Sequence, residues 1–179
     1  MPTYIVLLRG INITGHKIIR MADLQAYFAG CGATNVRTYI QSGNVVCEHR
    51  AKTSKALRRI VEEHLAGKLG YRVTAMVLSA KELFAAAAAN PYDVSLREFG
   101  RRMHVCFFEK APTPAAIKSI QPYINVREQL IVKNSAGYTY HADGLGRAKL
   151  SHAVIERKCG PTAMRNWNTV TALLELAGE

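Results

Sequence analysis

The loop over residues 10–20 has the residue types of an anion-binding site. Its two glycines have the spacing of a phosphate-binding loop, but His16 takes the place of that loop's lysine and Lys17 the place of the hydroxyl residue that would hold Mg²⁺. A helix is expected to follow, and the free N–H groups at its start favour an anion. We therefore expect a weak anion site rather than a nucleoside triphosphatase, or else a long turn that Asn12 caps. The basic residues that could bind the anion are Arg9, Lys17 and Arg20.

A second polar turn, Ser42-Gly43-Asn44, separates two β-rich segments. A serine nucleophile needs a base within hydrogen-bond reach, and that base needs an orienting partner. The glycine-flanked strand-to-helix turn that exposes the serine of many hydrolases is not found around Ser42. Serine, glycine and asparagine are favoured in tight turns. The interpretation as a turn therefore competes with one in which Ser42 and Asn44 bind a ligand.

The segment 162–169 combines an apolar stripe with polar residues. In a helix, Arg165, Asn168 and Thr169 would share one face. We expect Thr162 to cap this helix and hydrogen bonds to tie it to a loop. The functional alternative is that the planar guanidinium of Arg165 binds a phosphate or a carboxylate through parallel hydrogen bonds, while the neighbouring asparagines orient it.

The glycine-containing segment 144–149 adds two further cations, Arg147 and Lys149, just before a predicted helix. A histidine near such cations could act as an acid or a base. A small enzyme that acts on a phosphorylated or carboxylated metabolite is therefore an alternative hypothesis. The candidate acid, base or nucleophile residues are His16, Ser42 and His141.

Composition narrows the class of protein. The chain has 179 residues, with 24 Lys and Arg against 13 Asp and Glu, and a formal net charge of +11. A positive surface attracts phosphates and polyanions, so we expect an anionic partner. No apolar run approaches the roughly 20 residues that a bilayer requires, and the start resembles no secretory signal. We expect a cytoplasmic protein with reduced cysteines, no membrane partner, no metal and no cofactor.

Hydrophobic periodicity predicts an α+β protein with two similar halves. The first half has the order βαββαβ, which is the ferredoxin-like arrangement. Its strands are expected over 3–9, 36–41, 44–49 and 71–78, and its helices over 20–31 and 51–69. A connecting helix over 79–89 leads to strands over 103–108, 129–133 and 138–141 and to helices over 113–120 and 150–158. No final strand is evident in the second half, and a helix with an apolar stripe from Met164 to Ala177 is expected in its place.

Sheets of this topology resemble those of RNA-recognition modules, which stack bases on aromatic residues of the two central strands. The first half offers only Tyr4 on its first strand and no aromatic residue on its third. In the second half we expect Phe108 on the same face as Tyr138 and Tyr140, with basic residues nearby. Because helices must cover one face of each sheet, packing of these rings in the core is the alternative.

Three separate motifs occur together along the chain, and they resemble a bacterial family, that of domain of unknown function 1697. They are LLRGIN (7–12), RTYIQSGNVV (37–46) and MRNWNTVTALLEL (164–176), and the similarity extends from residue 3 to about residue 176. The resemblance implies a cytoplasmic α+β protein built from paired ferredoxin-like halves. It supplies no established activity and no catalytic residue. The family segment after the first motif contains GGK or similar, whereas the lysine here is displaced by one position, at Lys17.

We therefore expect two ferredoxin-like halves, residues 1–80 and residues 81–179, packed as one compact monomer or weak homodimer. The leading functional hypothesis is a protein that binds an anionic partner, either a nucleic acid or a phosphorylated metabolite, through a basic cleft. The expected binding residues are Arg9, Asn12, Lys17, Arg37, Ser42, Asn44, Arg165, Asn166 and Asn168.

Overall fold

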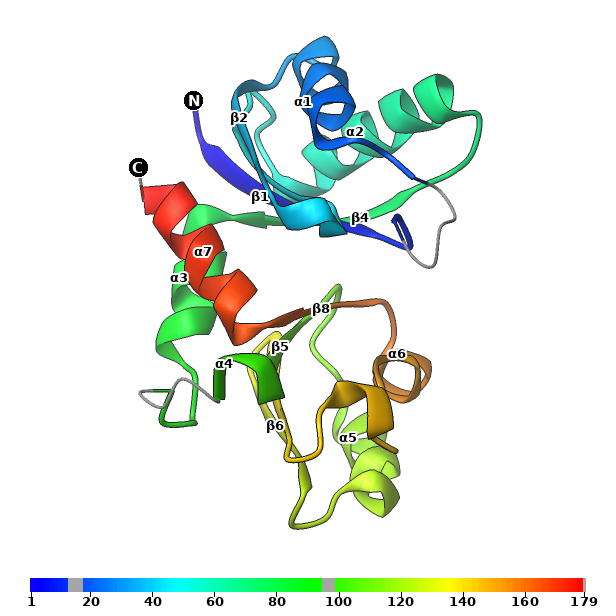
Figure 1. The fold of residues 1–179 in the computed structure, drawn as a ribbon, viewed down its shortest axis with the longest axis vertical. Coiled ribbons are helices and arrows are strands. Elements are labelled where there is room, and N and C mark those ends of the chain that lie inside the picture. The colour runs from blue at the N-terminus through cyan, green and yellow to red at the C-terminus, as the bar shows by residue number, and fades with distance from the viewer. Residues whose placement is uncertain (13–17, 95–98, 179) are drawn as a thin grey trace. The chain divides into compact units, whose positions relative to one another are not determined.

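The computed structural model describes residues 1–12, 18–94 and 99–178, and it contains two four-stranded antiparallel sheets (Figure 1). The chain forms two compact units. The first comprises Met1–Ala85 and the C-terminal segment from Ala172, and the second comprises Ala86–Thr171. The first unit thus continues a few residues past the predicted division at residue 80. Within the described part of the chain, no helix has both the length and the apolar composition to cross a membrane.

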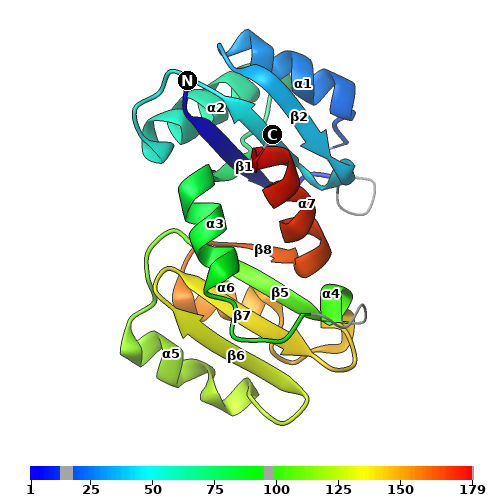
Figure 2. The ribbon, with the colours of Figure 1, turned by 90° about the vertical axis from the view of Figure 1, so that its left-hand side faces the viewer.

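The elements of the first unit follow the predicted order. They are β1 (Thr3–Arg9), α1 (Met21–Gly30), β2 (Thr34–Tyr39), the 3-10 turn η1 (Ile40–Ser42), β3 (Asn44–Glu48), α2 (Ser54–Leu69), β4 (Thr74–Ser79) and the first part of α3 (Ala80–Ala88). The strands lie in the order β2-β3-β1-β4, and Figure 2 labels two of them, β1 and β2. This order and the antiparallel pairing are those of the ferredoxin-like arrangement.

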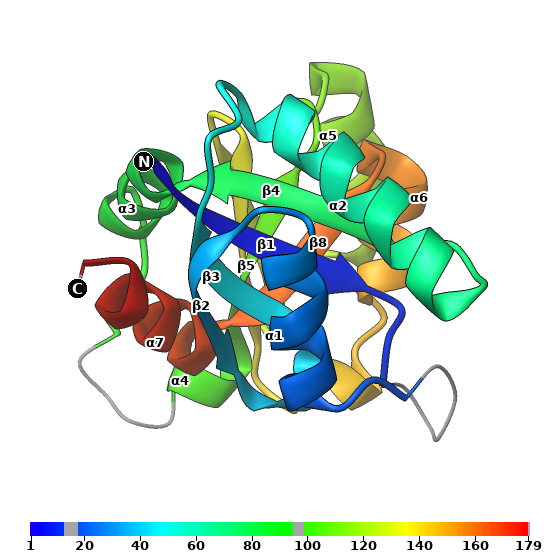
Figure 3. The ribbon, with the colours of Figure 1, turned by 90° about the horizontal axis from the view of Figure 1, so that it is seen from above.

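Helices α1 and α2 lie over one face of this sheet (Figure 3). Tyr4, Val6 and Leu8 alternate along β1, point to the helix-covered face and are buried. They pack with apolar residues at helical spacing, which are Leu24 and Phe28 of α1 and Leu57, Val61 and Leu65 of α2. Thr53 caps α2 by accepting a main-chain hydrogen bond, and Gly70 ends it in the left-handed conformation.

The second unit repeats this architecture. Its elements are α4 (Phe99–Arg102), β5 (Met103–Phe108), α5 (Pro114–Ile120), η2 (Gln121–Tyr123), β6 (Glu128–Lys133), β7 (Ala136–His141), η3 (Leu145–Arg147), α6 (His152–Cys159), β8 (Thr162–Asn166) and the first part of α7 (Trp167–Gly178). The strands lie in the order β6-β7-β5-β8 (Figure 2). This order matches that of the first sheet strand for strand.

The second sheet has a final strand, β8, which the sequence pattern does not predict. β8 pairs antiparallel with β5, and Met164 lies opposite Cys106. The expected helix from Met164 is therefore wrong for its first residues, and α7 begins only at Trp167. A strand of five residues carries little alternation of its own. The helical spacing of the apolar residues that follow it dominates the local pattern.

Equivalent residues of the two units can be matched through their strand registers. Tyr4 on β1 and His104 on β5 occupy the same position, because they pair with Ser79 on β4 and with Asn166 on β8. Ser79 and Asn166 each accept a hydrogen bond from the main-chain N–H three residues later, at 3.2 and 2.9 Å, and so cap the helix that follows. The expected pair of ferredoxin-like halves is confirmed, with one added helix after each.

The predicted aromatic face of the second sheet does not form. Phe108 belongs to the core under α5 and α6, where its ring lies against Gly137. Tyr138 follows Gly137 on β7 and so points to the opposite face, where its hydroxyl donates to the carbonyl of Ala86 at 2.6 Å. The expectation that Phe108 shares a face with Tyr138 and Tyr140 was wrong, because neighbouring residues of a strand point to opposite faces.

Candidate functional site

Three predicted binding residues of the first unit lie on one face of its sheet. Asn44 pairs with Leu7, and Arg37 pairs with Val46, so Arg9, Arg37 and Asn44 all point to the face opposite α1 and α2. The register places Arg9 and Arg37 on either side of the row that contains Asn44, about 14 Å apart along the strand direction. These residues share a face, and a common bound anion remains a prediction.

Asn12, Ser42 and Asn44 take part in hydrogen bonds that hold the turns of the first unit. The amide nitrogen of Asn12 donates to the carbonyls of Ile19 at 3.1 Å and Gln41 at 2.8 Å, and its oxygen accepts from the N–H of Ile19 at 2.7 Å. The amide nitrogen of Asn44 donates to the hydroxyl of Ser42 at 2.7 Å. These contacts support the turn interpretation of all three side chains.

The rest of the predicted anion-binding loop is only partly described. Lys17 and the candidate acid or base His16 lie outside the described residues. At the far end of the loop, Arg20 donates through Nε to the carboxylate of Asp23 at 2.7 Å. The guanidinium of Arg20 is therefore already engaged by a negative charge.

In the second unit, Arg165 and Asn166 end β8 and Asn168 lies in the first turn of α7. The predicted helical face of Arg165, Asn168 and Thr169 was wrong, because Arg165 belongs to the strand. Arg165 donates through Nη1 to the carbonyl of the preceding residue at 2.9 Å. Thr162 lies in β8 and cannot cap the helix. Asn166 provides that cap.

Replacing Asn166 by alanine is expected to lower the free energy of unfolding by about 1 kcal/mol, because α7 loses the side-chain acceptor at its start. Urea denaturation measures the change. The matched control is Thr171→Ala, which removes an exposed hydroxyl from the same helix and should change stability by less than about 0.5 kcal/mol. Equal effects of the two substitutions would contradict a capping role for Asn166.

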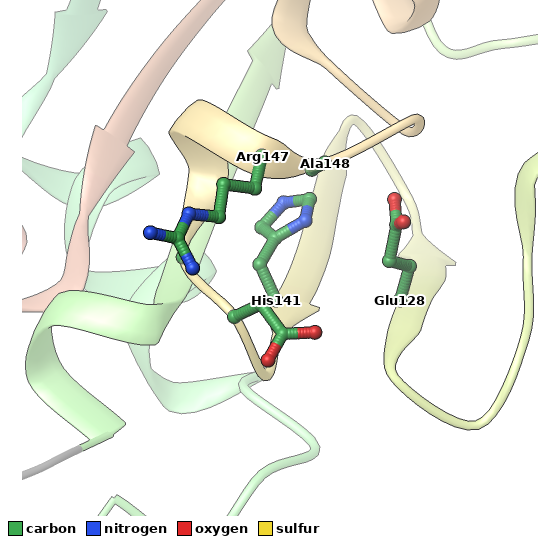
Figure 4. A pocket seen from close by; sticks show the side chains of 6 residues that line it. Glu128, His141, Arg147 and Ala148 are labelled. Carbon is green, nitrogen blue, oxygen red and sulfur yellow. The ribbon is translucent and has the colours of Figure 1, made fainter.

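A pocket of about 230 Å³ lies at one end of the second sheet (Figure 4). It is lined by Glu128, His141, Asp143, Gly144, Arg147 and Ala148. Glu128 begins β6 and His141 ends β7, and the two are register partners, so strand pairing places them side by side. The other lining residues follow β7 in the loop that contains η3. In Figure 4 the imidazole of His141 lies between the side chains of Arg147 and Glu128.

His141 forms the floor of this pocket and is only 1% exposed. Neither of its ring nitrogens has a hydrogen-bond partner among the described residues. The register match between the units gives His49 as the equivalent residue of the first unit, and His49 is also buried. There both ring nitrogens are bonded, one to the carbonyl of Cys31 at 3.1 Å and one to the N–H of Ala51 at 2.9 Å. Structural hydrogen bonds therefore explain why a histidine is buried in the case of His49, but they do not explain it in the case of His141.

Burial keeps both histidines near the pocket neutral at neutral pH. It lowers the pKa of His141, and the nearby carboxylate of Glu128 opposes this effect without reversing it. Burial, together with His141, lowers the pKa of His104 to about 4. The rings of His104 and His141 meet edge to face, with their centroids 5.6 Å apart. Protonation of one ring therefore disfavours protonation of the other.

The two carboxylates of the pocket have different partners. Glu128 accepts hydrogen bonds from the main-chain N–H groups of Lys149 at 3.2 Å and Leu150 at 2.6 Å. Asp143 accepts from Nε of Arg127 at 2.7 Å and from a second nitrogen of the same guanidinium. This paired bond is the main cause of the lowered pKa of Asp143. Asp143 is thus bound to a side-chain cation, and Glu128 to neutral groups.

Arg147 is the exposed cation of the pocket lining. Its guanidinium forms no hydrogen bond or ion pair with any residue in the described ranges, although its charge lowers the pKa of Asp143. A neutral imidazole can accept one hydrogen bond and donate another, and a guanidinium can bind an oxoanion. The arrangement can therefore hold a small oxoanion or move a proton at its edge. The described residues include no group of three metal-ligating side chains.

Part of this site was visible in the sequence. Residue type indicates His141, Arg147 and Lys149 as candidates, but it gives no reason to group Glu128, Asp143 and His104 with them. The internal repeat is the signal that could have revealed the site. Matching the two halves places His49 and His141 at equivalent positions, and the residues around them differ. Glu128 could have been noticed as a carboxylate at the start of an apolar strand.

Comparisons with known proteins give the fold but no activity. A protein-family model described as "Protein of unknown function (DUF1697)" matches residues 1–138. No curated protein matches the chain. The solved structure of a conserved bacterial protein, SP0830 from Streptococcus pneumoniae, is similar with a TM-score of 0.79 at 20% sequence identity, over 100% of this chain and 99% of that one.

Proposed function

The chain belongs to the DUF1697 family of proteins of unknown function, and from this premise we propose that its second unit binds a small ligand through an oxoanion group. The binding site is the pocket between Glu128, His141 and Arg147. The observation that carries the proposal is the buried imidazole of His141, whose two nitrogens have no hydrogen-bond partner in the described residues. An unsatisfied buried polar group lowers the free energy of unfolding by about 1–3 kcal/mol. We therefore expect the buried histidine to have a functional role.

Binding would begin at the exposed guanidinium of Arg147. Its long side chain lies beside the imidazole and is held by no bond to a described residue, so it can turn onto an incoming oxoanion (Figure 4). That movement would uncover a ring nitrogen of His141 at the pocket floor. The ligand would then accept one hydrogen bond from the imidazole and charge-assisted bonds from Arg147.

Size and surface favour a small molecule over a nucleic acid. Pockets for drug-sized ligands span about 300–1,000 Å³, and this pocket has about 230 Å³. It suits a metabolite of a few heavy atoms or one phosphate group of a larger molecule. The second sheet also does not present Phe108 and Tyr138 on one face, which removes the base-stacking surface expected there.

A second candidate function is a small enzyme that acts on a carboxylated or phosphorylated metabolite. The observation in its favour is that burial leaves His141 neutral at neutral pH, which is the state of a general base. Arg147 would hold the substrate's oxoanion, and His141 would take a proton from the bound molecule. Turnover of a substrate, rather than binding alone, would distinguish this function from the first.

The proposal places the protein in the cytoplasm, as a monomer or a weak homodimer. Its four cysteines are all free thiols, which suits a reducing compartment. Burial raises the pKa of Cys47 to about 12, so this thiol acts as a small apolar side chain of the core. None of these features requires a second chain.

The test is a titration of inorganic phosphate and of acetate, followed by NMR of the histidine ring signals. Replacing Arg147 by glutamine is expected to weaken binding about tenfold, because the oxoanion loses its charged donor. The matched control is Arg59→Gln, which removes the same charge from an exposed position on α2. Equal weakening by both substitutions would mean that net charge, and not this pocket, attracts the anion.

A further inference from the structure

The pocket in the second unit has one negative wall. Glu128 lies on the edge strand β6, and among the described residues its carboxylate accepts hydrogen bonds only from main-chain N–H groups. No basic side chain of the described residues forms an ion pair with it. Its negative charge is therefore held in place by the strand and by two neutral donors, with no cationic partner in the part of the chain that the structure describes.

The opposite wall carries a positive charge, which also has no bonded counter-ion among the described residues. Arg127 already neutralises Asp143 through its paired hydrogen bond. Arg147 then remains as a cation without a bonded carboxylate among the described residues. The neutral ring of His141 separates it from Glu128 (Figure 4).

We propose that this pocket takes a small zwitterion, with an oxoanion group on Arg147 and an ammonium group on Glu128. The inference rests on the proposed function and adds the second recognition group. A ligand with only negative charge would bring that charge towards the carboxylate of Glu128, which is unfavourable. A zwitterion instead supplies each wall with its missing partner through charge-assisted hydrogen bonds.

The dimensions suit a molecule in which the two charged groups are a few bonds apart. Glu128 and His141 are register partners on adjacent strands, and neighbouring strands lie about 4.8 Å apart. Arg147 approaches the same ring from the other side. The volume of about 230 Å³ admits an amino acid or an amino alcohol phosphate. The imidazole between the walls would donate a hydrogen bond to the oxoanion group of the ligand.

Two matched pairs of probes test the proposal on the unmodified protein. Alanine is compared with lactate, in which a hydroxyl replaces the ammonium group, and phosphoethanolamine is compared with ethyl phosphate. Calorimetry should give at least about tenfold tighter binding of the zwitterion in one pair, since a charge-assisted bond is gained. The pair with the larger effect identifies the oxoanion as a carboxylate or as a phosphate.

Replacing Glu128 by glutamine removes the negative charge and keeps an oxygen that can accept a main-chain hydrogen bond. The preference for the zwitterion should disappear, while binding of lactate or ethyl phosphate stays equal or tightens. The control is Glu63→Gln, an exposed carboxylate on α2, which should leave the preference intact.

Different outcomes overturn the oxoanion site and the preference for a zwitterion. If lactate and ethyl phosphate bind through Arg147 as tightly as their zwitterionic partners, the zwitterion proposal is overturned and the oxoanion site stands. If no probe binds to the folded protein, both are overturned. Because the probe comparison needs no variant, poor folding of Glu128→Gln would not spare the proposal.

Discussion

Replacing His141 by leucine is expected to raise the free energy of unfolding by about 1–2 kcal/mol and to abolish ligand binding. The imidazole is 1% exposed, and its nitrogens have no hydrogen-bond partner among the described residues. Leucine is of similar size and has no polar atom to desolvate, so the folded state no longer carries that cost. Urea denaturation measures the gain, and the titrations with phosphate and acetate measure the loss.

The matched control is the same substitution at the equivalent position of the first unit. His49→Leu removes two hydrogen bonds and leaves the carbonyl of Cys31 and the N–H of Ala51 without their partner. It should lower the free energy of unfolding by about 2 kcal/mol or more. Opposite signs at the two positions are the expected result. Destabilisation of similar size at both would mean that His141 serves packing, as His49 does.

The second large effect expected is a loss of about 3 kcal/mol of stability on acidification, through His104 alone. Burial and the neighbouring His141 lower the pKa of His104 from 6.5 to about 4 in the folded protein. Below pH 6.5 the unfolded chain binds a proton at this residue, whereas the folded chain does not. Stability from this group is therefore full above about pH 6.5, falls between about pH 6.5 and about pH 4, and is level below that. The lowered pKa of His141 adds a loss of the same sign.

Denaturant midpoints at about pH 7 and about pH 4.5 measure this effect, because most of the transition lies between them. His104→Phe removes this titrating group and should make the curve between these two values less steep, leaving the loss that His141 contributes. An equally steep loss in that variant would assign the acid sensitivity to other groups. Asp143 cannot produce it in this range, since its pKa is lowered and it stays ionised.

The fold was largely predictable because each sheet has a helix-covered face. In β1 the segment 4–8 is apolar throughout and buried on both faces, and a short continuous apolar run of this kind predicts a buried strand. The last strand, β8, could not be found in this way. Its main support is the pairing of Met164 with Cys106 on β5, a contact between residues far apart in the chain.

The candidate site was predictable only in parts. His141 and Arg147 could be named from residue type, since few other side chains move protons or bind oxoanions. Their relation to Glu128 depends on the pairing of β6 with β7, which no local pattern encodes. Residue type also placed Arg9 and Arg37 in one cluster, but could not give their separation along the sheet.

Because the first unit is discontinuous in the sequence, the two units are completed during synthesis in the reverse of the usual order. Domains generally fold in turn as they leave the ribosome, beginning at the N-terminus. Here the last residue of the second unit, Thr171, is translated before the segment from Ala172 that completes the first. A nascent chain thus finishes its later-encoded domain first. Loss of the segment from Ala172 would therefore damage the unit whose synthesis began earliest.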